Sequence, residues 1–192
     1  MTRVAFLIPG DLNLPTGGYA YDRRVLALLG RHDIEAVHVP LPSSFPAPTG
    51  ADLAETGRIV DALPQDAVLL IDGLAFGAMP ETLVHGFGRP IVALCHHPLA
   101  LEAGLSPERS GQLKASETAA LALACSVLVT SPATATILSR DFAVPAQRIT
   151  VAVPGTDPAR RAHGTGTPLR LLAGGSVVPR QGYDILGRAP PR

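Results

Sequence analysis

Short apolar runs alternate with amphipathic segments from the N-terminus to about residue 153. The runs are rich in Val, Ile, Leu and Ala, and each is short enough to be a buried strand. We expect six strands, at Arg3–Ile8, Ile34–Val39, Ala67–Ile71, Pro90–Leu94, Val127–Thr130 and Ile149–Val153. Helical spacing of apolar residues predicts helices between them, at Tyr19–Gly30, Ala51–Leu63, within Glu81–Phe87, at Ser106–Ala124 and from Ser131 to near Phe142. Continuous apolar strands alternating with helices are typical of a parallel sheet covered on both faces, so the predicted fold class is α/β with a mostly parallel sheet.

The character of the sequence changes at Pro154, where turn and loop residues begin to dominate. We therefore expect three parts: a Rossmann-like domain over residues 1–157, a polar, glycine-rich linker over 158–167, and a short C-terminal extension over 168–192. The extension is interpreted as the truncated start of a second Rossmann-like domain.

The extension repeats the order strand, glycine loop, helix. We expect a strand at Leu169–Ala173, then the pair Gly174-Gly175, then a helix that barely begins before Gly187. Because this strand has no sheet of its own, we expect it to be disordered, to pair with the edge of the first domain, or to be exchanged between two copies of the chain.

A turn-rich loop ending in Gly17-Gly18 joins the first predicted strand to the first helix. Thr16 can cap this helix, and the two glycines leave the N–H groups at its N-terminus open to a ligand. The positive end of the helix dipole would favour an anion there. Polar residues Asp22, Arg23 and Arg24 are predicted to lie on the face opposite the apolar side chains. The alternative is a long connection that happens to carry two glycines.

Other chemically notable residues also fall where predicted strands end. The pair Asp72-Gly73 follows the third strand, and His96-His97 follows the fourth. Parallel strands place their carboxyl ends at one edge of the sheet, so these residues and Gly17-Gly18 should share that edge.

The two histidines have both a functional and a local interpretation. Either imidazole could donate to a sugar hydroxyl or a phosphate oxygen, or carry a proton. Alternatively, one ring caps local backbone and the other is solvated. Glu102 could accept hydroxyl hydrogen bonds or be an ordinary surface glutamate, and Asp72 is expected to cap the next helix.

Composition excludes several classes of function. The chain has 192 residues with 16 basic and 16 acidic side chains, which argues against an electrostatic binder of nucleic acid or membrane surfaces. No apolar run approaches the roughly 18 residues of a membrane span, and no signal peptide is recognisable, so we expect a cytoplasmic protein. Apolar neighbours predict that Cys95 and Cys125 are buried free thiols.

Common cofactor and metal motifs are absent from the sequence. There is no Walker A pattern, no GxGxxG, no GxSxG, no HExxH, no Cys/His metal spacing and no DxD pair. The sequence therefore predicts no metal and no cofactor.

Several stretches, taken in order, resemble glycosyltransferase family 4, a family of metal-independent retaining enzymes of the two-domain GT-B type. The matching stretches are Thr16–Asp22, His96–Glu102, Glu117 with the helix leading to Val127–Ser131, Thr134, Pro154–Asp157 and Gly174–Asp184. They extend over nearly the whole chain. The resemblance implies two Rossmann-like domains facing across a cleft, with the N-terminal one on the acceptor side.

The resemblance also implies roles for individual residues. It places Gly17, Gly18 and Tyr19 against the donor phosphates or the acceptor. It places His96 or His97 near the transferred sugar as the catalytic candidates, with Glu102 close by. In the second domain the donor diphosphate would meet the segment that contains Gly175, Ser176, Arg180 and Gln181.

The chain departs from the family pattern in that last segment. Ser176 stands where many members have Arg, and Gln181 stands where they have Lys. Glutamine supplies no full positive charge to a diphosphate leaving group. The carboxylate pair that holds the donor sugar and ribose in the family has no counterpart before Arg192.

These observations predict a glycosyltransferase that moves a hexosyl group from a nucleotide sugar to a hydroxyl acceptor. Because half of the cleft is missing, we expect a truncated chain that is weakly active or inactive alone. Alternatives are a non-catalytic module that binds the acceptor or docks with a separately encoded C-terminal half, and a decayed remnant. A Rossmann-like enzyme of another class, such as a nucleotide-sugar epimerase, would equally need a second domain.

Overall fold

The computed structural model describes residues 2–164, 166–168, 170–175, 177 and 181–188. The chain divides into two units, Met1–Val153 and Pro154–Arg192. Within these described residues, the first unit contains the sheet and every helix except the short helix α7 (Tyr183–Gly187), which belongs to the second unit.

The first unit is built on six parallel strands. They are β1 (Thr2–Pro9), β2 (Ile34–Leu41), β3 (Val68–Asp72), β4 (Ile91–Cys95), β5 (Ser126–Val129) and β6 (Ile149–Val151). Their order across the sheet is β2-β1-β3-β4-β5-β6, and all five pairings are parallel. This is a Rossmann-like α/β fold, as the alternation of apolar runs predicts.

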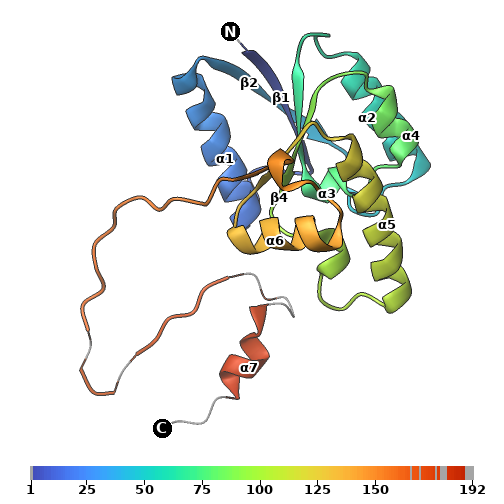
Figure 1. Cartoon of the computed structure of the whole chain (residues 1–192). Helices are drawn as coiled ribbons and strands as arrows, with labels where there is room; N and C mark the ends of the chain where they lie inside the picture. The colour runs from blue at the N-terminus through green and yellow to red at the C-terminus, as the bar shows by residue number, and fades with distance from the viewer. Residues whose placement is uncertain (1, 165, 169, 176, 178–180, 189–192) are drawn as a thin grey trace. The chain divides into compact units, whose positions relative to one another are not determined.

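Helices cover both faces of the sheet (Figure 1). On one face, α1 (Gly17–Leu29) packs Tyr21, Val25 and Leu26 against a cluster centred on Phe6 and Ile8. Side chains of successive strand residues point to opposite faces, so Ala5 and Leu7 of the same strand belong to the larger core on the other face.

The larger core is covered by the remaining helices of the first unit. These are α2 (Gly50–Asp61), α3 (Gly73–Phe76), α4 (Glu81–Gly86), α5 (Pro107–Leu123) and α6 (Pro132–Asp141). Their buried contributions to this core include Val60, Phe76, Val84, Ala120 and Leu138. The sheet is thus anchored mainly from this side.

Local sequence explains where the main helices begin. Thr16 caps α1 by accepting a hydrogen bond from Tyr19 N, as expected. Ser106 and Ser131 cap α5 and α6 in the same way, each followed by Pro at the first helical position. Thr49 and Asp52 form a capping box at α2.

Two expectations are corrected in this fold. Cys95 is buried as predicted, but Cys125 is exposed, because it precedes β5 at the surface and its Sγ lies 2.9 Å from Ile91 O. The strand expected at Leu169–Ala173 does not form over residues 170–173, where Leu171 and Leu172 are exposed; Leu169 lies outside the described residues. The second unit has no sheet of its own among its described residues, so these apolar residues have no ladder to join within it.

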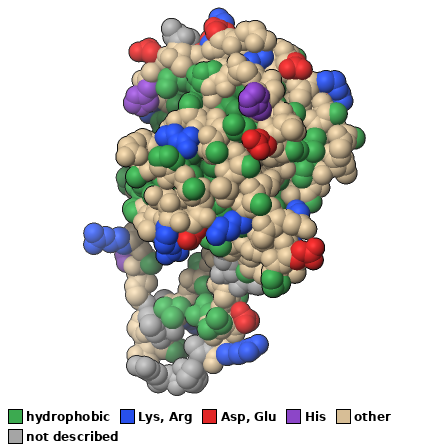
Figure 2. All heavy atoms as spheres, turned by 45° about the vertical axis from the view of Figure 1, so that its right-hand side comes forward, with side chains coloured by type: hydrophobic (Ala, Val, Ile, Leu, Met, Phe, Trp, Pro, Cys, Tyr) green, Lys and Arg blue, Asp and Glu red, His purple; other side chains and the backbone are tan. Residues whose placement is uncertain are grey.

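The surface carries both signs of charge. On the face seen in Figure 2, basic and acidic side chains are interspersed among apolar ones, in keeping with the equal numbers of each in the sequence. None of the helices in the described part of the chain is both long and apolar enough to cross a bilayer.

Candidate functional site

The strand order reverses direction at β1. The chain leaves β1 for β2 on one side and later enters β3 on the other side of β1. This reversal is a topological switch point, and ligands of open α/β sheets bind at such points, outside the carboxyl ends of the strands. The loop to α1, Asp72 at the end of β3 and His96 after β4 all lie at this edge.

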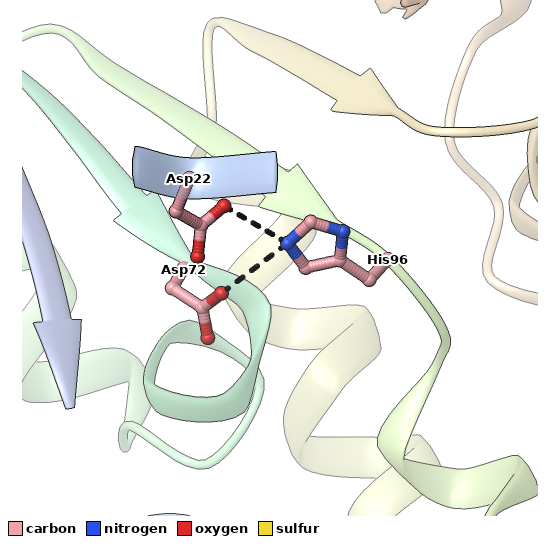
Figure 3. A group of neighbouring side chains, drawn as sticks. All are labelled: Asp22, Asp72 and His96. Carbon is pink, nitrogen blue, oxygen red and sulfur yellow. Dashed lines mark hydrogen bonds and ion pairs between the residues drawn. The ribbon is translucent and has the colours of Figure 1, made fainter. Parts of the chain in front are cut away.

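Three side chains meet at this edge, and we call Asp22, Asp72 and His96 the DDH cluster (Figure 3). His96 Nε2 is 3.0 Å from Asp22 Oδ1 and 3.7 Å from Asp72 Oδ2. Asp22 comes from α1, Asp72 from β3 and His96 from the loop after β4. The expectation that the strand-end residues share one edge is therefore confirmed for Asp72 and His96.

Asp22 corrects the sequence analysis. It was predicted on the polar face of the first helix, but its side chain is 0% exposed. The face of α1 that packs on the sheet is apolar along β1, but it carries Asp22 where it passes the strand ends. Asp22 is buried there because its carboxylate pairs with the His96 imidazole.

The electrostatics of the DDH cluster follow from burial. Burial raises the pKa of Asp72, the neighbouring Asp22 carboxylate raises it further, and His96 opposes the shift. Burial lowers the pKa of His96, but the hydrogen bond and charge of Asp22, with the charge of Asp72, more than reverse this and raise the pKa. The geometry therefore favours an imidazolium between two carboxyl groups.

Asp72 also performs the local role predicted for it. Its Oδ1 accepts a hydrogen bond of 2.8 Å from Leu74 N and so caps α3. This bond holds the carboxyl group in place and turns the other oxygen, Oδ2, toward His96. Asp72 is thus both a helix cap and a member of the cluster.

The N-terminus of α1 borders the cluster. A Cβ at Gly18 would lie 3.4 Å from His96 Cδ2, which is ordinary van der Waals contact, so glycine leaves this space empty. A Cβ at Gly17 would meet nothing within 4 Å. The two glycines therefore leave the first N–H groups of α1 accessible beside the imidazole.

Tyr19 and Tyr21 hold α1 against the strand ends. Tyr19 is buried, and its hydroxyl donates to Pro9 O at 2.6 Å. The Tyr21 hydroxyl donates to Ala152 O, and its ring packs edge-on against His96 with centroids 5.4 Å apart. The Tyr19 hydroxyl is thus bonded to the backbone at the end of β1, and the role of Tyr19 in substrate binding stays a prediction.

His97 and Glu102 lie apart from the DDH cluster, on the loop that follows β4. His97 Nε2 donates to Leu101 O at 3.3 Å, which is the local backbone contact weighed as the alternative for one of the two histidines. Glu102 ends the short 3₁₀ helix η2 (Leu99–Leu101) with its N–H bonded to Leu99 O. The structure thus brings only one of the two histidines into the cluster.

Glu117 supports the same loop from α5. It is buried, and its two carboxylate oxygens accept hydrogen bonds from Leu99 N (3.1 Å) and Ala100 N (3.4 Å). Burial raises the pKa of Glu117 to about 7, against the lowering effect of these two bonds. The available signal for this role is a charged residue just before the apolar C-terminal part of α5, Ala119–Leu123.

The remaining predicted site residues, Gly175, Ser176, Arg180 and Gln181, belong to the second unit. Gly175 lies next to Tyr183, whose Oη would be 2.7 Å from a Cβ at that position, and Gln181 is exposed. Ser176 and Arg180 lie outside the described residues. Their predicted roles remain predictions.

Comparisons with known proteins give a limited result. No family model matches the sequence, and no curated protein matches it. Crystal structures of Arabidopsis thaliana UGT89C1 are similar to the chain: the complex with UDP-L-rhamnose at 15% identity and a TM-score of 0.38, and the complex with quercetin at 13% and 0.40. The complex with UDP gives 14% and 0.36.

Each of these matches covers 98% of this chain, but only 48%, 55% and 49% of the respective UGT89C1 chain. The chain thus spans about half the length of the structures it resembles. Since the TM-scores are low, the fold assignment rests on the strand order of this chain itself.

Proposed function

We propose that this chain is the acceptor-side part of a glycosyltransferase, which transfers a hexosyl group from a nucleotide sugar to a hydroxyl acceptor. The observation that carries the proposal is the juxtaposition at the switch point of an open helix N-terminus and a histidine. A Cβ at Gly18 would touch His96, and a Cβ at Gly17 would meet nothing within 4 Å, so both glycines leave the space in front of α1 empty. Backbone N–H groups, a helix dipole and an imidazolium together suit a sugar phosphate.

Transfer of a hexosyl group would require stabilisation of the departing phosphate and orientation of the sugar. The bond between the anomeric carbon and the diphosphate oxygen breaks, and a bond to the acceptor oxygen forms, while the acceptor proton passes to the departing phosphate. The N–H groups of α1 would stabilise the negative charge of the phosphates, and His96 would donate to a sugar hydroxyl or phosphate oxygen. Asp22 and Asp72 would keep that imidazole charged and oriented.

The sequence resemblance to glycosyltransferase family 4 also supports this proposal, and it is the reason for proposing retention of configuration without a metal in the transfer step. The change of composition at Pro154 supports the proposed division into residues 1–157, 158–167 and 168–192, and the absence of a long apolar run from the sequence supports a proposed cytoplasmic location. Because Gln181 supplies no positive charge to a diphosphate leaving group, we propose that transfer by this chain alone is weak.

A second candidate is a non-catalytic module that binds an acceptor or a separately encoded partner. Gln181 favours it, because this exposed side chain carries no positive charge where the family has Lys. The two candidates differ in turnover rather than in binding. Product-detected transfer, measured with the chain and a panel of nucleotide sugars and hydroxyl acceptors, separates them.

Binding is tested by titrating UDP-glucose, GDP-mannose and pyrophosphate into the ¹⁵N-labelled chain and following its amide signals by NMR. We expect the signals of Gly17, Gly18 and His96 to shift most with at least one probe. Gly17→Asp should abolish these shifts, because the new carboxylate repels phosphate at the helix N-terminus.

Gly50→Asp is the matched control, since Gly50 also follows a threonine cap, is the first residue of its helix and has open space at its Cβ position. It should bind the probes like the wild type. Absence of shifts with every probe, or equal binding by Gly17→Asp, would contradict the proposed function.

A further inference from the structure

The DDH cluster concentrates more negative charge than its own residues balance. Asp22 and Asp72 are 0% and 1% exposed, and in the described chain both form ion pairs only with His96. When both carboxyl groups are ionised, two carboxylates against one imidazolium leave an excess of one negative charge in a buried place, and burial together with this excess raises the pKa of Asp72. Buried charges in proteins are paired or coordinate metals.

One oxygen of the cluster has no partner. Asp22 Oδ2 is buried and accepts no hydrogen bond, whereas Oδ1 of the same carboxylate contacts His96. Figure 3 shows the Asp22 carboxylate directed toward Asp72 and the imidazole, rather than toward the helix that carries it. A buried carboxylate oxygen without a partner is costly, so its position indicates a positively charged group that belongs between these side chains.

The spacing of the atoms suits a metal ion. The three candidate ligand atoms lie within 4.8 Å of one another, with Nε2–O distances of 3.0 and 3.7 Å. Metal–ligand bonds of about 2.1 Å place neighbouring ligand atoms of a tetrahedral or octahedral site roughly 3.0–3.5 Å apart. A small side-chain rotation would therefore bring all three atoms to one cation.

The support around these ligands fits the same interpretation. The bond from Leu74 N to Asp72 Oδ1 fixes that carboxylate and leaves Oδ2 directed at the cluster. The His96 side chain is 24% exposed, so the cluster opens to solvent next to Gly18. Water could complete the coordination there.

We propose that Asp22, Asp72 and His96 bind one divalent transition-metal cation, with Zn²⁺ or Mn²⁺ preferred over Mg²⁺ and Ca²⁺. The imidazole ligand sets this preference, because Mg²⁺ and Ca²⁺ favour oxygen ligands. The sequence analysis predicts no metal because it tests local spacing, whereas these ligands are 50 and 24 residues apart along the chain. Metal coordination replaces the proton on His96 Nε2, so the metal-bound cluster and the imidazolium of the proposed sugar transfer are alternative states of the same three residues.

The test is calorimetric titration of ZnCl₂ and MnCl₂ into the full chain after removal of metals with EDTA, at pH 7.5. We expect binding of one ion per chain, a higher melting temperature with the metal, and weaker binding of MgCl₂. Asp22→Asn, Asp72→Asn and His96→Gln should each weaken binding at least about tenfold. His97→Gln is the matched control and should bind like the wild type.

A measurement on the unmodified chain keeps the test valid if a variant fails to fold. The ¹⁵N signal of His96 Nε2 should shift on addition of Zn²⁺, because coordination replaces its hydrogen bond to Asp22. A chain that binds neither Zn²⁺ nor Mn²⁺ would overturn the proposal, as would affinity unchanged by Asp22→Asn and Asp72→Asn. Either result would leave the cluster as a proton-sharing triad without affecting the proposed sugar phosphate binding.

Discussion

Among the residues that the structure describes, carboxyl groups are buried in two places, and their surroundings differ. On the side of the sheet covered by α5, Glu117 accepts one backbone N–H at each oxygen, from Leu99 and Ala100. At the strand ends beside α1, Asp22 and Asp72 face each other and share His96, and one Asp22 oxygen has no partner. Both carboxylate oxygens of Glu117 therefore have hydrogen-bond donors, whereas the DDH cluster leaves one carboxylate oxygen without a donor.

This difference indicates that the Glu117 carboxylate has a structural role, whereas the carboxylates of the DDH cluster are suited to binding a ligand. Glu117 ties α5 to η2, the turn that directly follows His96, His97 and Pro98, so it helps to position the loop that carries the histidines. The DDH cluster is incomplete by itself and opens to solvent at His96. Removal of a carboxylate should therefore cost stability at Glu117 and cost little at the cluster.

The largest expected effect tests that contrast directly. Glu117→Ala should lower the free energy of unfolding by about 3 kcal/mol, because two buried backbone N–H groups lose their acceptors at ~1–3 kcal/mol each. Asp72→Asn should change this free energy by less than about 1 kcal/mol. Asparagine keeps the cap on Leu74 N and removes one of two neighbouring negative charges that repel each other. Urea denaturation measures both. Equal losses in the two variants would contradict the contrast.

The next effect concerns pH. The pKa of Glu117 is raised from its ordinary value of 4.5 to about 7 by burial, so the folded state holds this proton more tightly than the unfolded state. Its contribution to stability is fully present below pH 4.5 and is lost as the pH rises toward 7. Between pH 5 and 7.5 the loss should amount to about 2 kcal/mol.

The control for this pH effect is Glu117→Gln, which lacks the titrating group. Urea denaturation of both proteins at pH 5 and 7.5 isolates Glu117, since Asp72 and His96 titrate in both. An identical pH dependence in the wild type and the variant would show that Glu117 does not titrate in this range.

The smallest expected effect on stability concerns the close packing of Gly73, which follows Asp72, against β4. A Cβ at Gly73 would lie 3.0 Å from Leu94 O and 3.4 Å from Cys95 Cα, so this glycine allows close approach of the chain to β4 just before His96. Gly73→Ala should destabilise the protein by about 1 kcal/mol through this overpacking. Gly50→Ala, with nothing near its Cβ position, should remain within about 0.5 kcal/mol of the wild type.

Thermal melts of the Gly73 and Gly50 variants measure this difference. NMR signals of His96 in Gly73→Ala should also shift, because the backbone of β4 must move to admit the methyl group. A Gly73→Ala protein with wild-type stability and unshifted His96 signals would show that this close approach has no importance.

Much of the fold was predictable because it is encoded locally. Apolar runs located all six strands of the first unit to within two residues of their ends, and Thr16, Ser106 and Ser131 marked helix starts that the structure confirms. The parallel alternation also predicted that Asp72 and His96 share an edge, since carboxyl ends of parallel strands meet.

The site was predictable only in part. Sequence reasoning selected His96, Gly17 and Gly18 but put Asp22 on the outer face of its helix and gave Glu117 no structural role. Asp22 follows two aromatic residues in a mixed helix, and its burial depends on a histidine 74 residues later in the chain. Local patterning carries no information on such a partner.

By itself, the sequence determined the elements of this protein and their parallel α/β arrangement, because hydrophobic periodicity and helix caps act over a few residues. Only the tertiary structure decided which polar residues are buried together. The switch point between β1 and β3 brings Asp22, Asp72 and His96 within contact, and burial then sets their charge and pairing. Electrostatic interactions of this kind depend on distance and burial, which strand order creates and local sequence does not contain.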